Sequence, residues 1–386
     1  MAEVALFAGD RFYRSQFNTG QASYTIFQKD GVVYADPGYP GGTPYSGTDV
    51  GAVVNSCITN LASSSAGTGV ILARGIVQTV TTGIILNLAP EGRLIFDADC
   101  NITWNGTGDF IKITASSSIV EFLGTFKFNA TNQIMFHLNN VQNCYCRAFR
   151  VLSNSGSILS GTKVVYLDGA TAYYNEFWLD TFSQVDIGIH FPFVTVGANA
   201  NNVLFASFGT VNYGIKIDNQ ARNNWLGDIQ IQTGGANTAG VYIDGQSNWV
   251  GKLYGEYAGG GPVLFLDTHA SNNRVSYLRQ EGAGTELTNN ANAAYNDIHL
   301  TRPYGFTIVT PAVPATTVAQ FNTFPFPVKI YFLTTGTVTV VKITDATGAF
   351  QSINTAITVP MELILESGYQ ITLTFTAAPT WKWCGM

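Results

Sequence analysis

Charge is the scarcest feature of this 386-residue chain. Asp, Glu, Lys and Arg make up 11% of it, whereas a typical soluble domain carries about 25%. The 19 basic and 25 acidic residues give a net charge of -6, and the lack of a basic patch argues against nucleic-acid binding. Disorder is unexpected, because 13% of residues are aromatic and disordered chains are poor in apolar residues. The surface must be largely neutral and polar, or buried against another chain.

Long apolar runs, a leader and a cysteine framework are missing as well. No stretch approaches the ~20 apolar residues of a transmembrane helix, so no membrane span is expected. The first residues lack a charged segment followed by an apolar one, so we expect no classical secretion signal. The five cysteines are odd in number and irregularly spaced, which argues against a disulfide framework and predicts buried free thiols.

Internal repeats dominate the middle of the chain. Five segments, starting at Val164, Gly188, Gly214, Gly240 and Pro262, superpose on one pattern. Each reads as a short apolar strand, usually an Asp, a polar loop, an Asn and a second strand. The Asn residues recur every 22–27 positions. The Asp column contains Asp168, Asp218, Asp244 and Asp267, and the Asn column contains Asn175, Asn202, Asn224, Asn248, Asn273 and Asn296.

A period near 24 residues, without helical periodicity or a leucine-rich pattern, predicts a parallel β-helix in which each repeat forms one coil. We expect the Asn side chains to stack from coil to coil with their amides hydrogen-bonded along the column. The residue two positions after each Asn is apolar and should point inward, and the next column has small members that suggest a bend. The inward column is Phe177, Leu204, Leu226, Val250, Val275 and Ile298, and the next is Trp178, Phe205, Gly227, Gly251, Ser276 and His299.

The start of the repeats resembles the opening of the pectin-lyase-like right-handed parallel β-helix superfamily. Residues 47–55 (GTDVGAVVN) and 69–75 (GVILARG) carry this resemblance, because they are similar to two stretches that open many such helices. The resemblance covers roughly residues 46–303 and implies a right-handed β-helix. It also implies a short amphipathic helix that caps the first coil. The buried face of that helix would carry Ala52, Val53, Cys57 and Leu61.

The two ends of the chain differ from the repeats. Residues 304–386 alternate apolar and polar side chains in short strands separated by turns, which predicts a small antiparallel β-sandwich. Its closing stretch, residues 378–383 (APTWKW), resembles the end of C-terminal domains that follow tail-spike-like β-helices, which implies trimerisation or glycan binding. Residues 1–45 form an N-terminal segment in which residues 24–35 predict a two-stranded hairpin. It would either plug the solenoid or attach the protein to something larger.

Charged and aromatic residues concentrate on one predicted outward face. Neighbouring coils lie ~4.8 Å apart, so Glu256 and Glu281 are expected roughly 5 Å apart. That is near the carboxyl separation of retaining glycosidases, about 5–5.5 Å, whereas Asp228 would lie farther from Glu256, nearer the inverting geometry. Tyr254 and Tyr277 suit stacking on sugar rings, and Arg279 suits the carboxylate of an anionic sugar. The predicted face comprises Asp228, Gln230, Gln232, Lys252, Tyr254, Glu256, Tyr277, Arg279 and Glu281.

The same pattern permits a passive interpretation. Lys252 and Arg279 beside these acids would form an ion-pair ladder worth about 0–1 kcal/mol per pair, and exposed charges are usually inert. Trp225 and Trp249 share a column and suit either a sugar-stacking strip or packing against a loop or another chain. The Asp column is more typical of turns than of calcium sites, which need about 6–8 oxygen ligands. The four histidines lack metal-like spacing, so no metal or cofactor is expected.

Three functions remain open. The layout is similar to that of viral or phage tail spikes and fibres, which implies a homotrimer that recognises cell-surface glycans. Such a protein would be located in the virion or outside the cell, with residues 1–45 docking to a virion baseplate or tail. The same fold also carries glycoside hydrolases and polysaccharide lyases, for which Glu256, Glu281 and Asp228 would be the catalytic residues. The third possibility is a non-enzymatic structural protein of a cell surface or filament.

Overall fold

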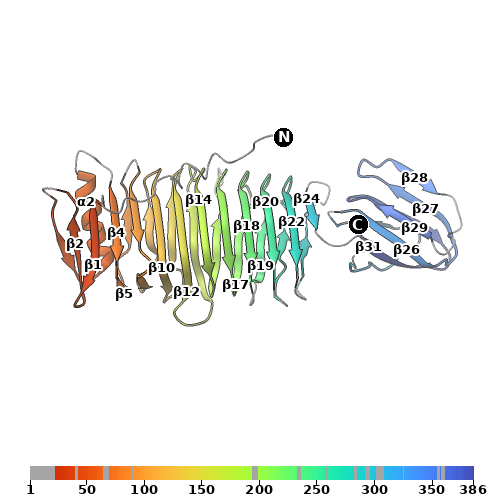
Figure 1. Ribbon diagram of the computed structural model, residues 1–386. Helices are drawn as coiled ribbons and strands as arrows, with labels where there is room; N and C mark the ends of the chain where they lie inside the picture. Colours follow the sequence, from red (N-terminus) through yellow and green to blue (C-terminus); the bar gives the residue numbers. More distant parts are fainter. Residues whose placement is uncertain are drawn as a thin grey trace, which may run out of the picture.

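The computed structural model describes residues 22–386 with short gaps, and a solenoid and a C-terminal domain follow one another along its length (Figure 1). Within these residues, no helix has the length and apolar character that crossing a membrane would require. The internal gaps are residues 40–41, 64–68, 89–90, 194–198, 233–235, 257–259, 282–284, 292–295, 301–307, 325, 354–356 and 358–360.

Two long parallel sheets, sheet A and sheet B, form the walls of the solenoid. Each coil adds one strand to each sheet, which confirms the predicted all-β parallel β-helix, here of about eight turns. The coil strands of sheet A are β4 (Val70–Arg74), β7 (Arg93–Phe96), β10 (Ile119–Phe128), β12 (Tyr145–Ser153), β14 (Glu176–Phe182), β16 (Asn202–Phe208), β18 (Trp225–Ile231), β20 (Trp249–Gly255), β22 (Arg274–Gln280) and β24 (Asp297–Leu300), with β5 (Val77–Val80) and β8 (Asn101–Trp104) beside β10. Sheet B contains β6 (Ile84–Leu86), β9 (Asp109–Ile113), β11 (Ile134–Asn139), β13 (Leu159–Asp168), β15 (Val185–Phe191), β17 (Val211–Ile217), β19 (Ala236–Ile243), β21 (Leu264–Leu266) and β23 (Leu287–Asn289).

The core lies between the two sheets, where apolar side chains of successive coils stack in columns. The predicted inward column is confirmed except at one position. In that coil Val203, rather than Leu204, pairs with Phe177 on one side and Leu226 on the other, and Val203 is fully buried. Leu204 falls where the register shifts by one residue, a β-bulge, so it leaves the inward column and points away from the core. The five cysteines, Cys57, Cys100, Cys144, Cys146 and Cys384, are free and buried, as predicted.

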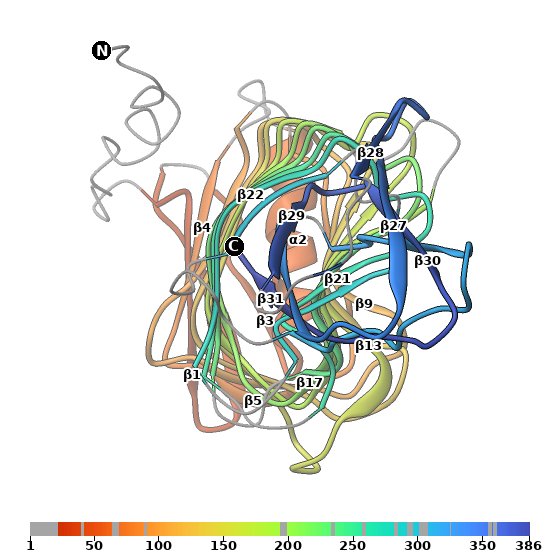
Figure 2. The same cartoon turned by 90° about the vertical axis from the view of Figure 1, so that its right-hand side faces the viewer.

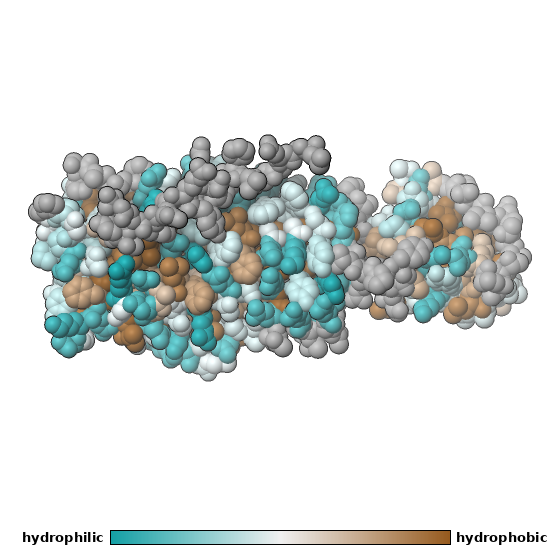
Figure 3. Space-filling model, viewed as in Figure 1, coloured by the Kyte–Doolittle hydropathy of each residue, from teal (hydrophilic) through white to brown (hydrophobic). Residues whose placement is uncertain are grey.

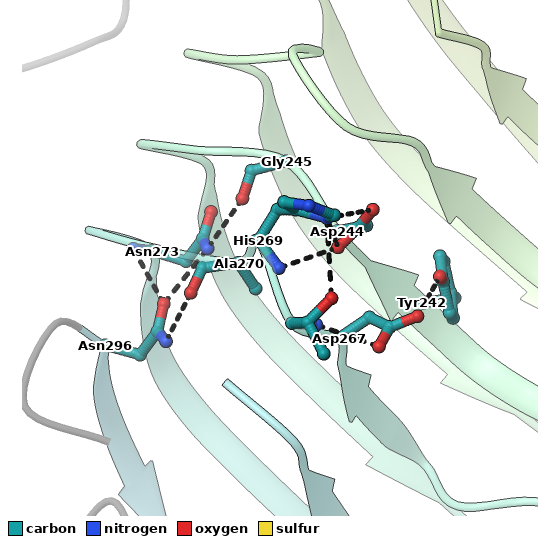
Figure 4. Close-up of polar contacts among 9 residues, drawn as sticks. Tyr242, Asp244, Gly245, Asp267, His269, Ala270, Asn273 and Asn296 are labelled. Carbon is teal, nitrogen blue, oxygen red and sulfur yellow. Dashed lines mark hydrogen bonds and ion pairs between the residues drawn. The ribbon is translucent and has the colours of Figure 1, made fainter. Parts of the chain in front are cut away.

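A ladder of asparagine side chains joins the coils at the corner before each sheet A strand from β14 to β24. The Nδ2 of Asn224 donates to Asn248 Oδ1 (3.0 Å), and Asn248 repeats this contact with Asn273 (3.1 Å). Asn273 donates both to Asn296 Oδ1 and to the carbonyl of Gly245, each at 3.0 Å (Figure 4). The predicted amide stacking is therefore present. The buried members are Asn175, Asn201, Asn224, Asn248, Asn273 and Asn296.

The second member of the ladder differs from the sequence prediction, since Asn201 takes the place expected for Asn202. Asn201 is fully buried, and its Oδ1 accepts both the backbone N–H of Asn175 (3.1 Å) and the side-chain amide of Asn175 (3.0 Å). Asn202 instead begins β16 and is half-buried. Each interior ladder Asn follows a residue with positive φ, such as Ser247 (55°), so a left-handed turn aims the amide along the solenoid axis.

An N-terminal hairpin and one helix close the first coil. β1 (Tyr24–Lys29) and β2 (Val32–Pro37) pair across a turn at Asp30 and Gly31, whose φ angles of 52° and 79° are those of a type I′ hairpin. The predicted hairpin is therefore present. β1 continues sheet A by pairing in parallel with β4, and β3 (Tyr45–Gly47) pairs with β2.

The helix, α2 (Val50–Ser63), lies across the end of the solenoid, within the outline of the coils (Figure 2). Asp49 of the GTD motif caps it by accepting the N–H of Ala52 (3.2 Å), and also accepts the N–H of Thr81 (2.8 Å) from the next turn. Ala52 itself is exposed, contrary to prediction, because Val53 and Val54 occupy the buried stripe. The buried residues of α2 are Val50, Gly51, Val53, Val54, Cys57, Ile58 and Leu61.

The C-terminal domain is the predicted antiparallel β-sandwich with its own core. Trp383 is fully buried in that core, and Trp381 Nε1 donates to the carbonyl of Pro311 (2.8 Å), which ties the preceding linker to the sandwich. One sheet contains β25 (Ala319–Phe321), β27 (Val338–Thr344), β28 (Phe350–Ile353) and β30 (Gln370–Phe375), and the other contains β26 (Val328–Thr334), β29 (Met361–Leu365) and β31 (Thr380–Gly385).

A matched pair of substitutions tests the ladder. Asn201→Ala removes the acceptor of two buried donors of Asn175, so it should reduce the free energy of unfolding by on the order of 3 kcal/mol. Asn202→Ala, one residue later and half-buried, removes one hydrogen bond to Glu176 and should cost only about 1 kcal/mol. Urea unfolding followed by circular dichroism measures both, and equal losses would contradict the assignment of Asn201 to the ladder.

Candidate functional site

The outer side of sheet A collects the residues that the sequence predicts for one face. Asp228 pairs with Lys252, and Tyr254 pairs with Gln230 on one side and Arg279 on the other. The intervening Ile229, Leu253 and Leu278 are fully buried, so the polar residues face outward. We call this the sheet A face, and over β18, β20 and β22 it is mostly hydrophilic (Figure 3). It comprises Asp228, Gln230, Gln232, Lys252, Tyr254, Glu256, Tyr277, Arg279 and Glu281.

A bend within each strand sets the orientation of this face. Gly227 and Gly251 lie at this bend, directly before the outward-facing Asp228 and Lys252, and the register of β18 and β20 is unbroken across it. A Cβ atom on Gly227 would stand 2.6 Å from the carbonyl oxygen of Leu204, so only glycine permits the close approach there. The bend predicted from the small residues is therefore present. The β-bulge at Leu204 moves Trp178 and Phe205 out of the glycine column and aligns them with Asp228.

Tyr254 is the centre of the hydrogen bonding on the sheet A face. Its Oη lies 2.7 Å from Glu256 Oε1 and 2.6 Å from Glu281 Oε2. Hydrogen bonds to Glu281 and Glu256 raise the pKa of Tyr254, because they favour the protonated phenol. The hydroxyl therefore stays protonated at neutral pH and donates to one carboxylate at a time. The two carboxylates lie on either side of a single phenol oxygen, so the predicted proximity of Glu256 and Glu281 is present.

Two ion pairs accompany these contacts. Arg279 Nη2 lies 2.5 Å from Glu281 Oε1, and Lys252 Nζ lies 3.4 Å from Asp228 Oδ2. The four side chains are 39–48% exposed, and pairs in such settings contribute about 0–1 kcal/mol. A hydrogen bond with Tyr277 and the charge of Glu281 raise the pKa of Arg279. Each cation is thus already engaged by an acid of the protein.

A hollow of about 130 Å³ opens beside Tyr254, and Gln230, Ile231, Gln232, Tyr254 and Glu256 line it. Pockets that enclose a drug-sized ligand measure ~300–1,000 Å³. The hollow is therefore too small to enclose a drug-sized ligand. Its lining offers two primary amides, a phenol and a carboxylate, which can donate and accept hydrogen bonds in several directions.

The tryptophan pair lies away from the hollow. Trp225 and Trp249 are neighbours on β18 and β20, as predicted. Trp249 is 46% exposed and donates from Nε1 to Ser276 Oγ (2.7 Å). Both stand at the first residue of their strands, whereas the hollow begins five residues later, about 16 Å along a strand. A single sugar unit cannot contact the hollow and the tryptophan pair at once. The structure therefore brings Tyr254, Glu256 and Glu281 together but not the tryptophans.

Sequence reasoning missed an aromatic stack that continues the sheet A face toward the N-terminus. Trp178 stacks on Phe205 with ring centroids 5.4 Å apart, and Phe205 pairs with Asp228. Arg147 lies 5.9 Å from the Trp178 ring, and Arg147 and Trp178 both donate to Asp180, at 3.2 and 2.8 Å. We call Arg147, Trp178 and Phe205 the aromatic stack. The bulge concealed it, because counting from the Asn places these rings in the glycine column.

The Asp column lies at the ends of the sheet B strands, where its members bind side chains of the protein. Asp218 accepts from His190 (2.9 Å) and Lys216 (2.9 Å). Asp244 binds His269 (3.1 Å), and Asp267 accepts from Tyr242 (Figure 4). Within the described part of the chain, no three His, Cys, Asp or Glu side chains converge closely enough to hold a metal ion. These contacts link neighbouring coils through the turns.

Asp218 is held in its charged form. Burial opposes this, but hydrogen bonds from His190 and Lys216 outweigh it and lower the pKa of Asp218 to about 2. Burial also lowers the pKa of His190, with Asp218 opposing the shift. Both shifts make the folded protein less stable in acid. Acidification neutralises the Asp218 carboxylate and charges the His190 imidazole, and the fold stabilises the opposite form of each.

Asp218→Asn should flatten the loss of stability in acid. The pKa of Asp218 is about 2 in the folded state and about 3.9 in an unfolded chain. Its contribution is therefore full above about pH 5 and is lost as the pH falls toward 2. Over that range the unsubstituted protein should lose on the order of 2 kcal/mol more than the variant. Urea unfolding at a series of pH values measures this, with exposed Asp36→Asn as the control, and parallel pH profiles for Asp218→Asn and the unsubstituted protein would refute it.

Comparisons with known proteins give structural likenesses only. No protein-family profile and no curated protein matches the chain. Among solved structures, the ORF18 protein of Geobacillus virus E2 is similar over 92% of this chain and 86% of its own, with 12% identity and a TM-score of 0.44. The enzymatically active domain of tailspike protein 4 from bacteriophage CBA120 is similar over 94% and 71%, with 10% identity and a TM-score of 0.26. Likenesses at these TM-scores carry no argument about function, which must come from the site itself.

Proposed function

We propose that the chain is a tail-spike or tail-fibre protein that binds a cell-surface glycan on the outer side of sheet A. The hollow at Tyr254 carries this proposal, because it combines an aromatic ring with amide and carboxylate groups on rigid strands. These are the groups that hold a sugar by stacking and by hydrogen bonds to its hydroxyls. Trp178 and Phe205 extend the same surface along the solenoid axis, so a glycan chain would cross the strands rather than follow one.

The scarcity of charge supports assembly as a homotrimer. Charged residues make up 11% of the chain, and large apolar side chains such as Ile85, Phe149 and Phe193 are more than half exposed. Ile85 and Phe149 lie on different sheets, and the proposal places the uncharged faces of the solenoid against other subunits. In this proposal the protein is virion-associated or extracellular, and its N-terminal segment binds a virion baseplate or tail.

Cleavage of the glycan is the second candidate, and the proximity of Glu256 and Glu281 across Tyr254 favours it. A hydrolase needs one carboxylic acid that remains protonated near neutral pH, usually through burial. Glu256 is exposed and Glu281 is 41% exposed in its side chain, and Glu281 is paired with Arg279. The setting therefore fits binding better than acid catalysis.

A glycan panel scored for both binding and release of oligosaccharides separates these candidates. We expect binding without release. Tyr254→Ala should weaken binding at least 10-fold, the loss of about 1.4 kcal/mol typical of a contact residue, whereas exposed Tyr174→Ala should not. Release that disappears in both Glu256→Gln and Glu281→Gln would instead establish an enzyme at this site.

Light scattering coupled to gel filtration tests the assembly. The full chain should elute as a species of three times the chain mass, because the proposal places a solenoid face between subunits. A monomer across micromolar concentrations would contradict the trimer, and open-ended polymers would favour a filament protein instead.

A further inference from the structure

The charges around the hollow restrict the sugar that it can accept. The two nearest cations, Lys252 and Arg279, contact Asp228 and Glu281 respectively, at 3.4 and 2.5 Å. Their charge is therefore compensated within the protein. A third cation on the same strands, Arg274, contacts Asp297 at 3.5 Å. An anionic sugar that paired with one of these cations would also lie beside the carboxylate that the cation already contacts, so the net attraction would be small.

Glu256 lies on the lining of the hollow with no such compensation. Its Oε1 receives the hydroxyl of Tyr254, and among the described residues no lysine, arginine or histidine lies within ion-pair distance of it. The other polar lining groups, Gln230 and Gln232, are neutral amides. Gln232 is further engaged with Ser207 (2.8 Å). The hollow thus has a net negative lining, and a second carboxylate placed in it would meet like charge.

We infer that the sugar unit seated in the hollow is uncharged and presents neighbouring hydroxyl groups to Glu256. This inference rests on the proposed glycan binding. A carboxylate has two oxygens and accepts two hydroxyl hydrogens at once, and such charge-assisted bonds are stronger than bonds between neutral groups. The amides of Gln230 and Gln232 offer both donors and acceptors to the remaining hydroxyls, and the Tyr254 ring offers a stacking surface. An uncharged sugar in the hollow differs from the expectation that Arg279 holds the carboxylate of an acidic sugar.

Matched pairs of polysaccharides test the charge preference with the full-length protein. Polygalacturonate, alginate and hyaluronan are each compared with their carboxyl-reduced forms, beside neutral dextran and mannan, by affinity electrophoresis and calorimetry. We expect binding to be confined to neutral members of the panel, with affinity changed less than about 2-fold by 0.5 M salt, since contacts without ion pairing are little screened.

Variants tie the preference to Glu256. Glu256→Gln keeps the size of the side chain but removes its charge, so it should lower affinity for the neutral polymer about 10-fold, which is about 1.4 kcal/mol. Glu256→Gln should also reduce the difference in affinity between each acidic polysaccharide and its carboxyl-reduced form. Glu366→Gln, an exposed change on the C-terminal domain with the same effect on net charge, should change neither.

The outcomes separate this inference from the proposed function. Binding to an acidic polymer in preference to its reduced form would overturn the inference and leave glycan binding standing. A preference for neutral polymers that persists unchanged in Glu256→Gln would also overturn it, because the discrimination would then arise elsewhere. Failure to bind any member of the panel would overturn the proposed function, and this inference with it.

Discussion

From Asn175 to Asn296, buried asparagines bond each coil to the next, and the site on the solenoid depends on this constraint. Each interior ladder amide donates to the Asn of the following coil, and its oxygen accepts from the Asn of the preceding one. A coil that slipped by one residue would bury a polar group without a partner, at a cost of about 1–3 kcal/mol for each group. A strand of sheet A begins at the residue after each ladder Asn from Asn175 to Asn296, so the register set at this corner is carried directly into the sheet.

That register explains why a functional face is possible on so simple a repeat. In β16, β18, β20 and β22, a residue at a given distance from the ladder Asn stands directly beside its counterparts on the neighbouring coils. Tyr254 therefore meets Arg279 and Gln230 without a loop to position it. The β-bulge at Leu204 adds a second feature, because it brings the aromatic stack of the earlier coils level with Asp228. A ligand that crosses the strands would meet one new side chain in every coil.

The fold and the composition of the sheet A face could be predicted from the sequence because both depend on spacing alone. Asn224, Asn248 and Asn273 stand clearly apart from other asparagines, so counting from them succeeded. The same counting failed in the coil before them, because residues 199–202 read NANN and both Asn201 and Asn202 fit the period equally well. Only burial and the register shift beside Leu204 distinguish the two. The partners of the charged groups were also beyond prediction, because rotamers choose among several neighbours within reach.

The scarcity of charge follows from the same stacking. A charge that recurs in every coil lies beside its own kind at strand spacing, which is unfavourable, so charges persist where a partner accompanies them. The Asp column at the ends of the sheet B strands follows this rule. Each of Asp218, Asp244 and Asp267 contacts a histidine, lysine or tyrosine of its own. On sheet A, Glu256 and Glu281 also occupy neighbouring coils, yet they share one tyrosine hydroxyl, and Arg279 contacts Glu281. Departures from a rule that the rest of a fold obeys are typical of functional sites, and Glu256 is such a departure. Its uncompensated charge is explained if the hydroxyl groups of a ligand donate hydrogen bonds to the carboxylate of Glu256.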